Sequence, residues 1–318
     1  MYYARIETFT HFFAVYPHTL QLRNLIYKFA FDFVEYEWKY DPQTRRNQRV
    51  VGKVWGGVTE DQSQFRYPIS LLPKFLTLLK YNNVRDEQIE MLAAPMYEPA
   101  KAEFTLKSHF VPYDYQEEGI TFTLELKANG IMSALLQMPT GTGKTLTLLA
   151  LAARLKLRMA MVVAPAHLDK WVADFDSYLG LPKERVYVVR GSKAIQKLFL
   201  MAEQGLFDYD VILISLRTMQ EFCKAYDENP ELCEDLYRGT PFSIFEKSRV
   251  GFLGGDEVHE SFNAVYNFHT FIHGPFHLGL SATMLHSDPF IERMQKNIYP
   301  MAMRFDKIKM AKYIQFIN

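Results

Sequence analysis

The chain has 318 residues, of which 48% are hydrophobic and 15% aromatic, and its 36 Lys and Arg balance 36 Asp and Glu. This length predicts two domains, or one large domain with an appendage, in a well-packed globular protein. Because the net charge is zero, the chain as a whole has no electrostatic attraction for nucleic acid or an anionic membrane. Binding to either would therefore need a local patch of positive charge. The two cysteines, Cys223 and Cys233, have no metal-ligand spacing around them, which favours reduced thiols in the cytoplasm. The sequence contains neither a signal-peptide pattern nor an apolar run long enough to span a membrane, so no membrane partner is expected.

Residues 1–95 are expected to form a small mixed α/β domain. Apolar residues three and four apart predict a helix over 20–31, and a second helix is expected over 74–81. Strand-like pieces cover 33–38 and 49–55. Cations lie in and between these two strands, interleaved with three aromatic residues: Lys39, Arg45, Arg46, Arg49 and Lys53 beside Trp38, Tyr40 and Trp55.

Cations that contact phosphates, beside rings that stack on bases, predict a nucleic-acid surface on this hairpin. The residues leave an alternative open, which is a solvated hairpin whose aromatic side chains pack inward. Residues 96–111 then lose apolar periodicity and gain prolines and charges, which is typical of a linker.

A helix is expected to open just after Pro112, and its first turn carries Tyr113, Tyr115 and Gln116. A glutamine amide has one acceptor and two donors, so it can pair with N6 and N7 of adenine while a ring stacks on the base. We therefore expect these three residues to contact the base of a nucleotide.

Residues 135–145 are a short apolar run followed by a glycine-bearing turn, and 146–155 continue with an apolar helix pattern. Such a strand, turn and helix direct backbone N–H groups at a polyphosphate. Lys144 is expected to reach the outer phosphates, and the Thr145 hydroxyl to bind Mg²⁺. The strict phosphate-loop pattern requires glycine at position 138, where this chain has methionine. The candidate nucleotide-binding residues here are Pro139, Thr140, Gly141, Thr142, Gly143, Lys144 and Thr145.

Further along the chain, apolar strands alternate with helical stretches, which predicts a mostly parallel sheet covered on both faces. Strands are expected at 159–164, 186–189, 211–215, 250–254 and 277–281. Ligands of such sheets bind outside the carboxyl ends of the strands. Asp256 follows one of these strands and is a candidate Mg²⁺ ligand, while Glu257 is a candidate acceptor for the proton of the water that attacks the γ-phosphate.

Ser215, Arg217 and Thr218 follow another strand, so their hydroxyl and guanidinium groups are candidates for nucleic-acid phosphates. Capping of the next helix is the alternative. His259 is expected to couple the nucleotide site to Ser281 or Thr283, and the alternative is a buried histidine with satisfied hydrogen bonds.

Histidines recur at positions 269, 273, 277 and 286 without a His-Glu-x-x-His pattern, so a zinc hydrolase is poorly supported.

The order of these motifs over residues 110–290 resembles the first motor domain of superfamily-2 helicases. Residues 115–116 are similar to the adenine-reading motif of that superfamily, and 138–145 to its phosphate loop, in which the first glycine is routinely absent. Residues 256–259 resemble its acidic box in the DExH form. Pro165, with Ala164 before it and Trp171 after it, resembles a loop that contacts the nucleic-acid backbone. Residues 215–218 resemble a second such loop, and 281–283 the coupling motif. Within the superfamily, the chain most resembles the UvsW-like branch-migration helicases of phages.

The resemblance implies a RecA-like ATP-binding motor domain over 112–300, with 301–318 starting a linker to a second motor domain that the chain lacks. It also implies a monomeric, ATP- and Mg²⁺-dependent DNA helicase or translocase in the cytoplasm, or in the host cytoplasm for a phage protein. Branched or forked DNA in replication, recombination or repair is the expected substrate. Because arginines of the second domain complete such ATP sites, this chain is expected to bind ATP but hydrolyse it weakly.

Other nucleic-acid motors remain as alternatives: a remodeller-like duplex translocase, or a restriction-type helicase subunit. A further alternative is a DNA-structure-binding module that uses ATP only as a switch.

Overall fold

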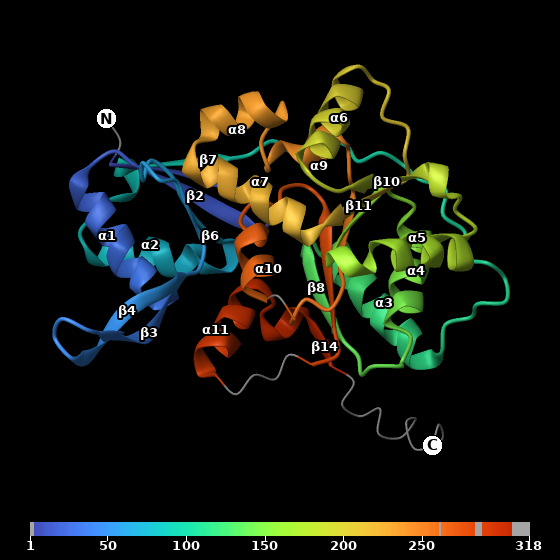
Figure 1. Ribbon diagram of the computed structural model, residues 1–318, viewed down its shortest axis with the longest axis horizontal. Coiled ribbons are helices and arrows are strands. Elements are labelled where there is room, and N and C mark those ends of the chain that lie inside the picture. The colour runs from blue at the N-terminus through green and yellow to red at the C-terminus, as the bar shows by residue number, and fades with distance from the viewer. Residues whose placement is uncertain (1–2, 261, 284–287, 307–318) are drawn as a thin grey trace.

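The computed structural model describes residues 3–260, 262–283 and 288–306, in which a small mixed-sheet domain packs beside a larger parallel-sheet domain (Figure 1). Both domains are α/β, so the predicted fold class is confirmed. Within the described ranges, no helix is long and apolar enough to cross a membrane.

The N-terminal domain is built on a five-stranded sheet in the order β5-β6-β2-β1-β7. Its neighbours pair antiparallel, except that β7 pairs parallel with β1. The strands are β1 (Ala4–Thr8), β2 (Phe12–Pro17), β5 (Gly57–Val58), β6 (Phe65–Pro68) and β7 (Ile89–Ala93). Helices α1 (Leu20–Ala30) and α2 (Leu72–Tyr81) confirm the two helices expected from the sequence. The Thr19 hydroxyl caps α1 by accepting a hydrogen bond from the Leu22 amide.

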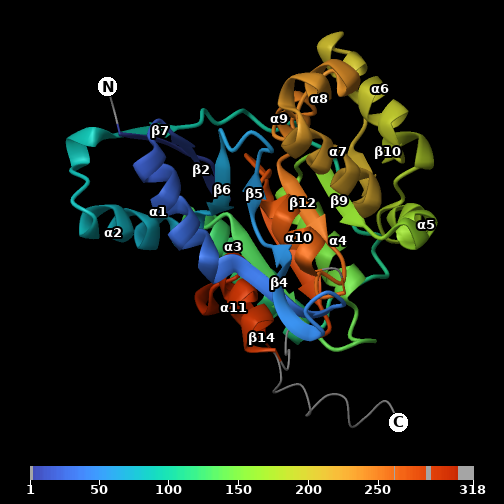
Figure 2. The ribbon, with the colours of Figure 1, turned by 60° about the vertical axis from the view of Figure 1, so that its left-hand side comes forward.

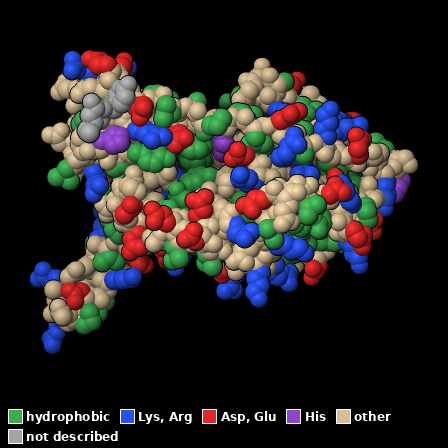
Figure 3. Space-filling view, turned by 90° about the horizontal axis from the view of Figure 1, so that it is seen from above, with side chains coloured by type: hydrophobic (Ala, Val, Ile, Leu, Met, Phe, Trp, Pro, Cys, Tyr) green, Lys and Arg blue, Asp and Glu red, His purple; other side chains and the backbone are tan. Residues whose placement is uncertain are grey.

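A separate two-stranded hairpin, β3 (Val34–Asp41) and β4 (Arg46–Val54), extends from this domain (Figure 2). In the space-filling view it projects at the lower left as an arm whose end carries Lys and Arg (Figure 3). Trp38 and Tyr40 are 71% and 62% exposed. The inward-packed alternative is therefore wrong for these two rings. It holds for Trp55, which is buried against Phe262 and outside both strands.

The larger domain is built on a seven-stranded sheet in the order β10-β11-β9-β12-β13-β8-β14, in which all neighbouring strands are parallel. The strands are β8 (Ser133–Gln137), β9 (Met159–Val163), β10 (Val186–Val189), β11 (Val211–Ser215), β12 (Phe252–Gly255), β13 (Phe276–Ser281) and β14 (Arg304–Asp306). The parallel sheet predicted from the sequence is confirmed. Strand β14 was not predicted, because its three residues fall in the segment assigned to a linker over 301–318; residues 307–318 lie outside the described ranges.

Helices cover both faces of this sheet, as alternation along the strands requires. In β9, Met159, Met161 and Val163 pack into one apolar cluster, whereas Ala160 and Val162 pack into another. The first face carries α3 (Asp114–Ala128), α4 (Lys144–Leu155) and α5 (Leu168–Leu179). The second carries α6 (Ser192–Glu203), α7 (Leu216–Glu228), α8 (Pro230–Tyr237), α9 (Ser243–Lys247) and α10 (Phe262–His269). Helix α11 (Pro289–Ile298) packs in a third cluster, with Leu135 of β8.

The two domains share one apolar cluster, which joins the N-terminal sheet and helices to α10, α11 and Leu135 of β8. Arg66 of β6 is buried at this junction, where it pairs with Asp227 of α7 and its guanidinium lies 4.1 Å from the centre of the Phe271 ring. The segment 96–111, expected as a linker, has little regular structure. Two of its residues, Ala102 and Phe104, are nevertheless buried in the core of the larger domain.

Three buried histidines also lie between the domains. The ring centres of His11, His269 and His277 are 5.1 to 5.9 Å apart. His11 bonds the Ser133 hydroxyl and the Pro275 carbonyl, at 2.9 and 2.8 Å. Burial lowers the pKa of His11 to about 4 and that of His277 to about 3, and it holds the pKa of His269 well below its ordinary value.

These pKa values predict acid sensitivity. Below pH about 6.5 these histidines are protonated in the unfolded chain but stay neutral in the folded chain. The free energy of unfolding therefore decreases by up to about 1.4 kcal/mol per pH unit for each histidine as the pH falls. His269→Leu should reduce this decrease, because it removes one imidazole that burial keeps unprotonated in the folded chain. Both ring nitrogens of His269 lack a partner among the described residues, so the substitution breaks no hydrogen bond there. Urea unfolding at pH 7.5 and 5 measures the effect.

The matched control for this substitution is His18→Leu, at an exposed position. The control should lose as much stability between the two pH values as the unchanged protein. An equal decrease in His269→Leu would contradict the assignment of acid sensitivity to the buried cluster.

Candidate nucleotide and nucleic-acid sites

The turn between β8 and α4 is a preformed loop at the N-terminus of a helix. Gly141 and Gly143 adopt φ angles of +83° and +80°, which only glycine adopts without strain. The Thr142 hydroxyl donates to the Pro139 carbonyl at 2.6 Å, closing the turn. The first N–H groups of α4 therefore face a site at the carboxyl edge of the sheet, where the helix dipole favours an anion.

Gln116 supports this loop from α3. Its Nε2 donates to the Thr142 carbonyl at 2.9 Å, its Oε1 accepts from the Tyr113 amide at 2.8 Å, and its side chain is buried. A side chain on Gly143 would collide with this amide. Reading of adenine by Gln116 stays a prediction.

Two tyrosines flank Gln116. The Tyr115 hydroxyl donates to the Thr142 carbonyl at 3.0 Å, and partial burial raises the pKa of this phenol, which keeps it a donor. Tyr113 is largely exposed, and its ring stacks on Tyr115 with centroids 5.8 Å apart. Tyr113 therefore offers an open ring face beside the loop.

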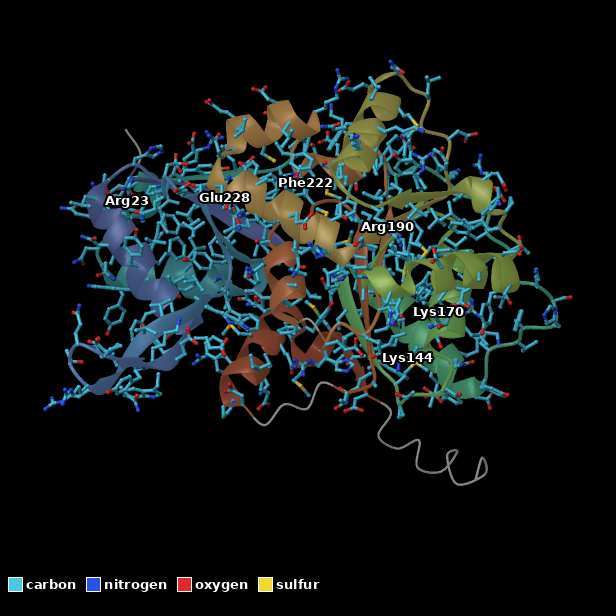
Figure 4. All side chains as sticks on the ribbon, viewed as in Figure 1. Arg23, Lys144, Lys170, Arg190, Phe222 and Glu228 are labelled. Atoms are coloured by element: carbon cyan, nitrogen blue, oxygen red, sulfur yellow. The ribbon has the colours of Figure 1, made fainter. Side chains whose placement is uncertain are left out.

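The structure brings Lys144 and Glu257 together. The Lys144 ammonium lies 2.9 Å from Glu257 Oε1 and also donates to the Met138 carbonyl at 3.3 Å. Figure 4 shows Lys144 at the start of α4. Its side chain is only 9% exposed, so the pair is largely shielded from water. This pair is the centre of the candidate site.

Asp256, next to Glu257, accepts a hydrogen bond from Trp171, for which the sequence suggested another role. The indole N–H of Trp171 donates to Asp256 Oδ2 at 3.1 Å, and Trp171 is fully buried on α5. The sequence places Trp171 only beside a loop that resembles a nucleic-acid contact. Asp174 lies one helical turn after Trp171. Burial raises the pKa of its carboxyl group, and the negative charge of nearby Asp256 raises it further. No sequence signal links an indole on one helix to a carboxylate 85 positions away.

The oxygens at this site suit Mg²⁺. Thr145 supplies a hydroxyl beside Lys144 and Asp256 supplies a carboxylate, and oxygen ligands of this kind, with phosphates, are those that Mg²⁺ prefers. Across residues 3–260, 262–283 and 288–306, no three His, Cys, Asp or Glu residues gather in a way that could hold a metal. His286, one of the recurring histidines, lies outside these ranges.

Residues of the expected coupling motif contact Glu257. His259 Nδ1 lies 3.4 Å from Glu257 Oε2 and 3.0 Å from Ser281 Oγ. The Ala282 amide donates to the same Glu257 oxygen at 3.2 Å, while Ser281 Oγ donates to the Thr283 carbonyl at 2.6 Å. A change at Glu257 can therefore reach the end of β13 through direct hydrogen bonds.

The candidate nucleic-acid contacts differ in accessibility. Pro165, which follows β9, is exposed, and so is Arg217, which pairs with Glu221 on its own helix at 3.0 Å. Ser215 and Thr218 are buried, and Thr218 Oγ1 accepts from the Gly191 amide at 2.9 Å. The β3–β4 hairpin, which carries the remaining cations, lies at the opposite side of the molecule from α4 in Figure 1. The structure therefore does not bring all the predicted contacts into one place.

The shielded ion pair makes a testable prediction. A double-mutant cycle with Lys144→Met and Glu257→Gln should give a coupling of about 1–3 kcal/mol in the free energy of unfolding, because removing one partner leaves the other charge buried. Urea unfolding of the four proteins measures it.

The exposed pair Arg217–Glu221, at a similar distance of 3.0 Å, is the matched control. Its coupling should be at most about 0.5 kcal/mol. Equal couplings for the two pairs would contradict the importance given to shielding.

Residues 109–286, more than half of the chain, match the family model described as "Type III restriction enzyme, res subunit". The sequence matches no curated protein. The crystal structure of the UvsW helicase from bacteriophage T4 superposes with a TM-score of 0.50 and 14% identity, covering 96% of this chain and 99% of that one.

Two other solved structures are similar over part of their length. The Hef helicase domain of Pyrococcus furiosus has a TM-score of 0.40 and 21% identity, covering 59% of this chain and 36% of that one. The SWI2/SNF2 ATPase core of Sulfolobus solfataricus, in complex with dsDNA, has a TM-score of 0.40 and 16% identity, covering 65% and 38%.

Proposed function

Since the chain belongs to the type III restriction enzyme res subunit family, a family of helicase-type domains, we propose that it is an ATP-dependent DNA helicase or translocase. The observation that carries the proposal is the ion pair between Lys144, beside the phosphate loop, and Glu257. In the proposed mechanism both groups act on the γ-phosphate. Branched or forked DNA is the proposed substrate, in replication, recombination or repair. Its support is the motif order that resembles the UvsW-like helicases.

In this proposal, the loop amides and Lys144 hold the phosphates of ATP, and Tyr113, Tyr115 and Gln116 lie at its base. Bound Mg²⁺, held by Thr145 and Asp256, would neutralise phosphate charge. The Lys144 ammonium leaves Glu257 for the phosphates, which frees the Glu257 carboxylate to orient the attacking water and accept its proton. His259, Ser281 and Thr283 then couple this change to β13.

The nucleotide site can be tested by binding. Lys144→Ala should weaken binding of a fluorescent, non-hydrolysable ATP analogue about 100-fold or more, because the substitution removes a shielded cation. Glu257→Gln should strengthen binding several-fold, since it removes the carboxylate that competes for Lys144 and repels phosphate.

Lys170→Ala, at an exposed position on α5, is the control and should leave the affinity unchanged. Normal affinity in Lys144→Ala, or weaker binding in Glu257→Gln, would refute the proposed site. Turnover adds an independent check, because Glu257→Gln should abolish ATP hydrolysis while it retains the nucleotide.

We further propose that Arg45, Arg46, Arg49 and Lys53 contact nucleic-acid phosphates. No described acidic side chain forms an ion pair with any of the four. Replacing Arg45, Arg46 and Arg49 together by Gln should weaken DNA binding and reduce the slope of log K against log salt. The expected reduction is about 0.9 for each duplex phosphate that the protein then leaves unneutralised. Fluorescence anisotropy at several salt concentrations measures this slope, and an unchanged slope would remove the hairpin from the DNA interface.

A second candidate is a restriction-type subunit that translocates on unbranched duplex, and the family description favours it. The two candidates differ in substrate. A forked or four-way DNA should be remodelled by a branch-migration helicase, whereas a duplex translocase displaces a bound triplex strand from linear DNA without separating the duplex.

A further inference from the structure

The register of the β3–β4 hairpin separates its side chains by chemistry. Residues directly opposite each other across an antiparallel pair project to the same side. Trp38 lies opposite Arg49 and Lys39 opposite Gln48. One side carries Tyr36, Trp38 and Tyr40 with Val51, Arg49 and Asn47, and the other carries Glu37, Lys39 and Asp41 with Val50, Gln48 and Arg46. We call the first side the aromatic face.

The aromatic face is open to solvent. Trp38, Tyr40 and Val51 are 71%, 62% and 56% exposed. Among the described residues, no aromatic ring stacks on Trp38 or Tyr40. In the part of the chain that the structure describes, β3 and β4 form a two-stranded sheet of their own. Two large, rigid rings held in water on a projecting arm are costly unless a ligand covers them.

At its root the aromatic face continues into an apolar groove. Tyr36 contacts the Phe31 ring, with centroids 5.7 Å apart, and Phe31 lines the groove together with Val34 and Val54. The groove has a volume of about 330 Å³, within the roughly 300–1,000 Å³ of small-ligand sites. Its other aromatic walls are Tyr27, Trp55, Phe65 and Tyr67. A flat ring can therefore enter at the end of the aromatic face.

The charge on the hairpin favours an anionic ligand. From position 42 to 54 the sequence has four cations and no acid. Each of the three acids of β3 has a partner: Glu37 pairs with Lys39 at 2.9 Å, Asp41 accepts from Gln48 at 2.6 Å, and Glu35 accepts from the Trp55 indole at 3.4 Å. On the aromatic face itself, the Arg49 guanidinium lies 4.0 Å from the centre of the Tyr36 ring, where it can contact a phosphate while the ring contacts a base.

We propose that the aromatic face binds unpaired nucleotides of a nucleic-acid strand, and that the groove at its root receives one base. The proposal rests on the proposed function and specifies which part of a branched substrate the hairpin contacts. Bases stack on Trp38 and Tyr40, while the cations of β4 contact the backbone. A continuous duplex cannot use this face, because its bases are already paired and stacked within the helix. A nucleic-acid ligand also accounts for the cation among these rings, since Arg49 lies on the aromatic face.

Trp38 provides a direct readout, because Trp55 and Trp171 are 2% and 0% exposed. Oligo(dT) should quench the tryptophan fluorescence of the full chain, and a blunt duplex should not. Trp38→Phe should bind oligo(dT) with similar affinity but lose most of the quenching, because the only tryptophan that still contacts a base is then Trp55 in the wall of the groove. Trp38→Ala with Tyr40→Ala should weaken oligo(dT) binding about ten- to a hundredfold, because bases can no longer stack there, and leave duplex affinity unchanged.

Tyr81→Ala, at a tyrosine that is 89% exposed at the end of α2, is the matched control and should change neither affinity. Unchanged oligo(dT) binding in the double variant, or equal quenching by the blunt duplex, would overturn the proposal. Those results leave the proposed function standing if DNA still stimulates ATP hydrolysis. Failure of the function is recognised differently, by a chain that binds ATP but no oligonucleotide, duplex or fork.

Discussion

The parallel pairing of β12, β13 and β8 determines the candidate site. These strands are neighbours in the sheet, so the three segments that follow them leave from one edge. Two backbone hydrogen bonds fix that edge, from the Met138 amide to the Ser281 carbonyl and from the Val258 amide to the Leu280 carbonyl. The pairing of Lys144 with Glu257 follows from this constraint, although 113 positions separate the two residues. Glu257 contacts both Lys144 and His259, and a phosphate that binds Lys144 would have to displace Glu257.

Packing contacts also join the larger domain to the N-terminal domain. Helix α7 follows directly after the buried Ser215, in a segment expected to contact nucleic acid, and near its other end Asp227 pairs with the buried Arg66. The shared apolar cluster and the packing of Trp55 on Phe262 hold the root of the hairpin against α10. A strand held by the hairpin would therefore have a fixed position relative to the candidate nucleotide site.

Local patterns predicted much of this molecule from the sequence. The strand at 211–215 and the glycine-bearing turn before Lys144 follow from residues that are neighbours in the chain. The parallel pairing of β1 with β7 joins residues 85 positions apart, and neither strand was predicted. The bond from Trp171 to Asp256 and the engagement of Gln116 with the loop depend on packing between helices and loops. The aromatic face could not be predicted, because it depends on the pairing register of β3 and β4, which composition alone does not specify.

The central claim is that nucleic acid controls an ATP site built around Lys144, Asp256 and Glu257. Its most direct test is the rate of ATP hydrolysis by the whole protein without nucleic acid and with forked DNA, a four-way junction, blunt duplex or RNA in turn. We predict the largest stimulation with the forked and four-way DNA, and none for Lys144→Ala with any of them. A rate that no nucleic acid changes would contradict the account.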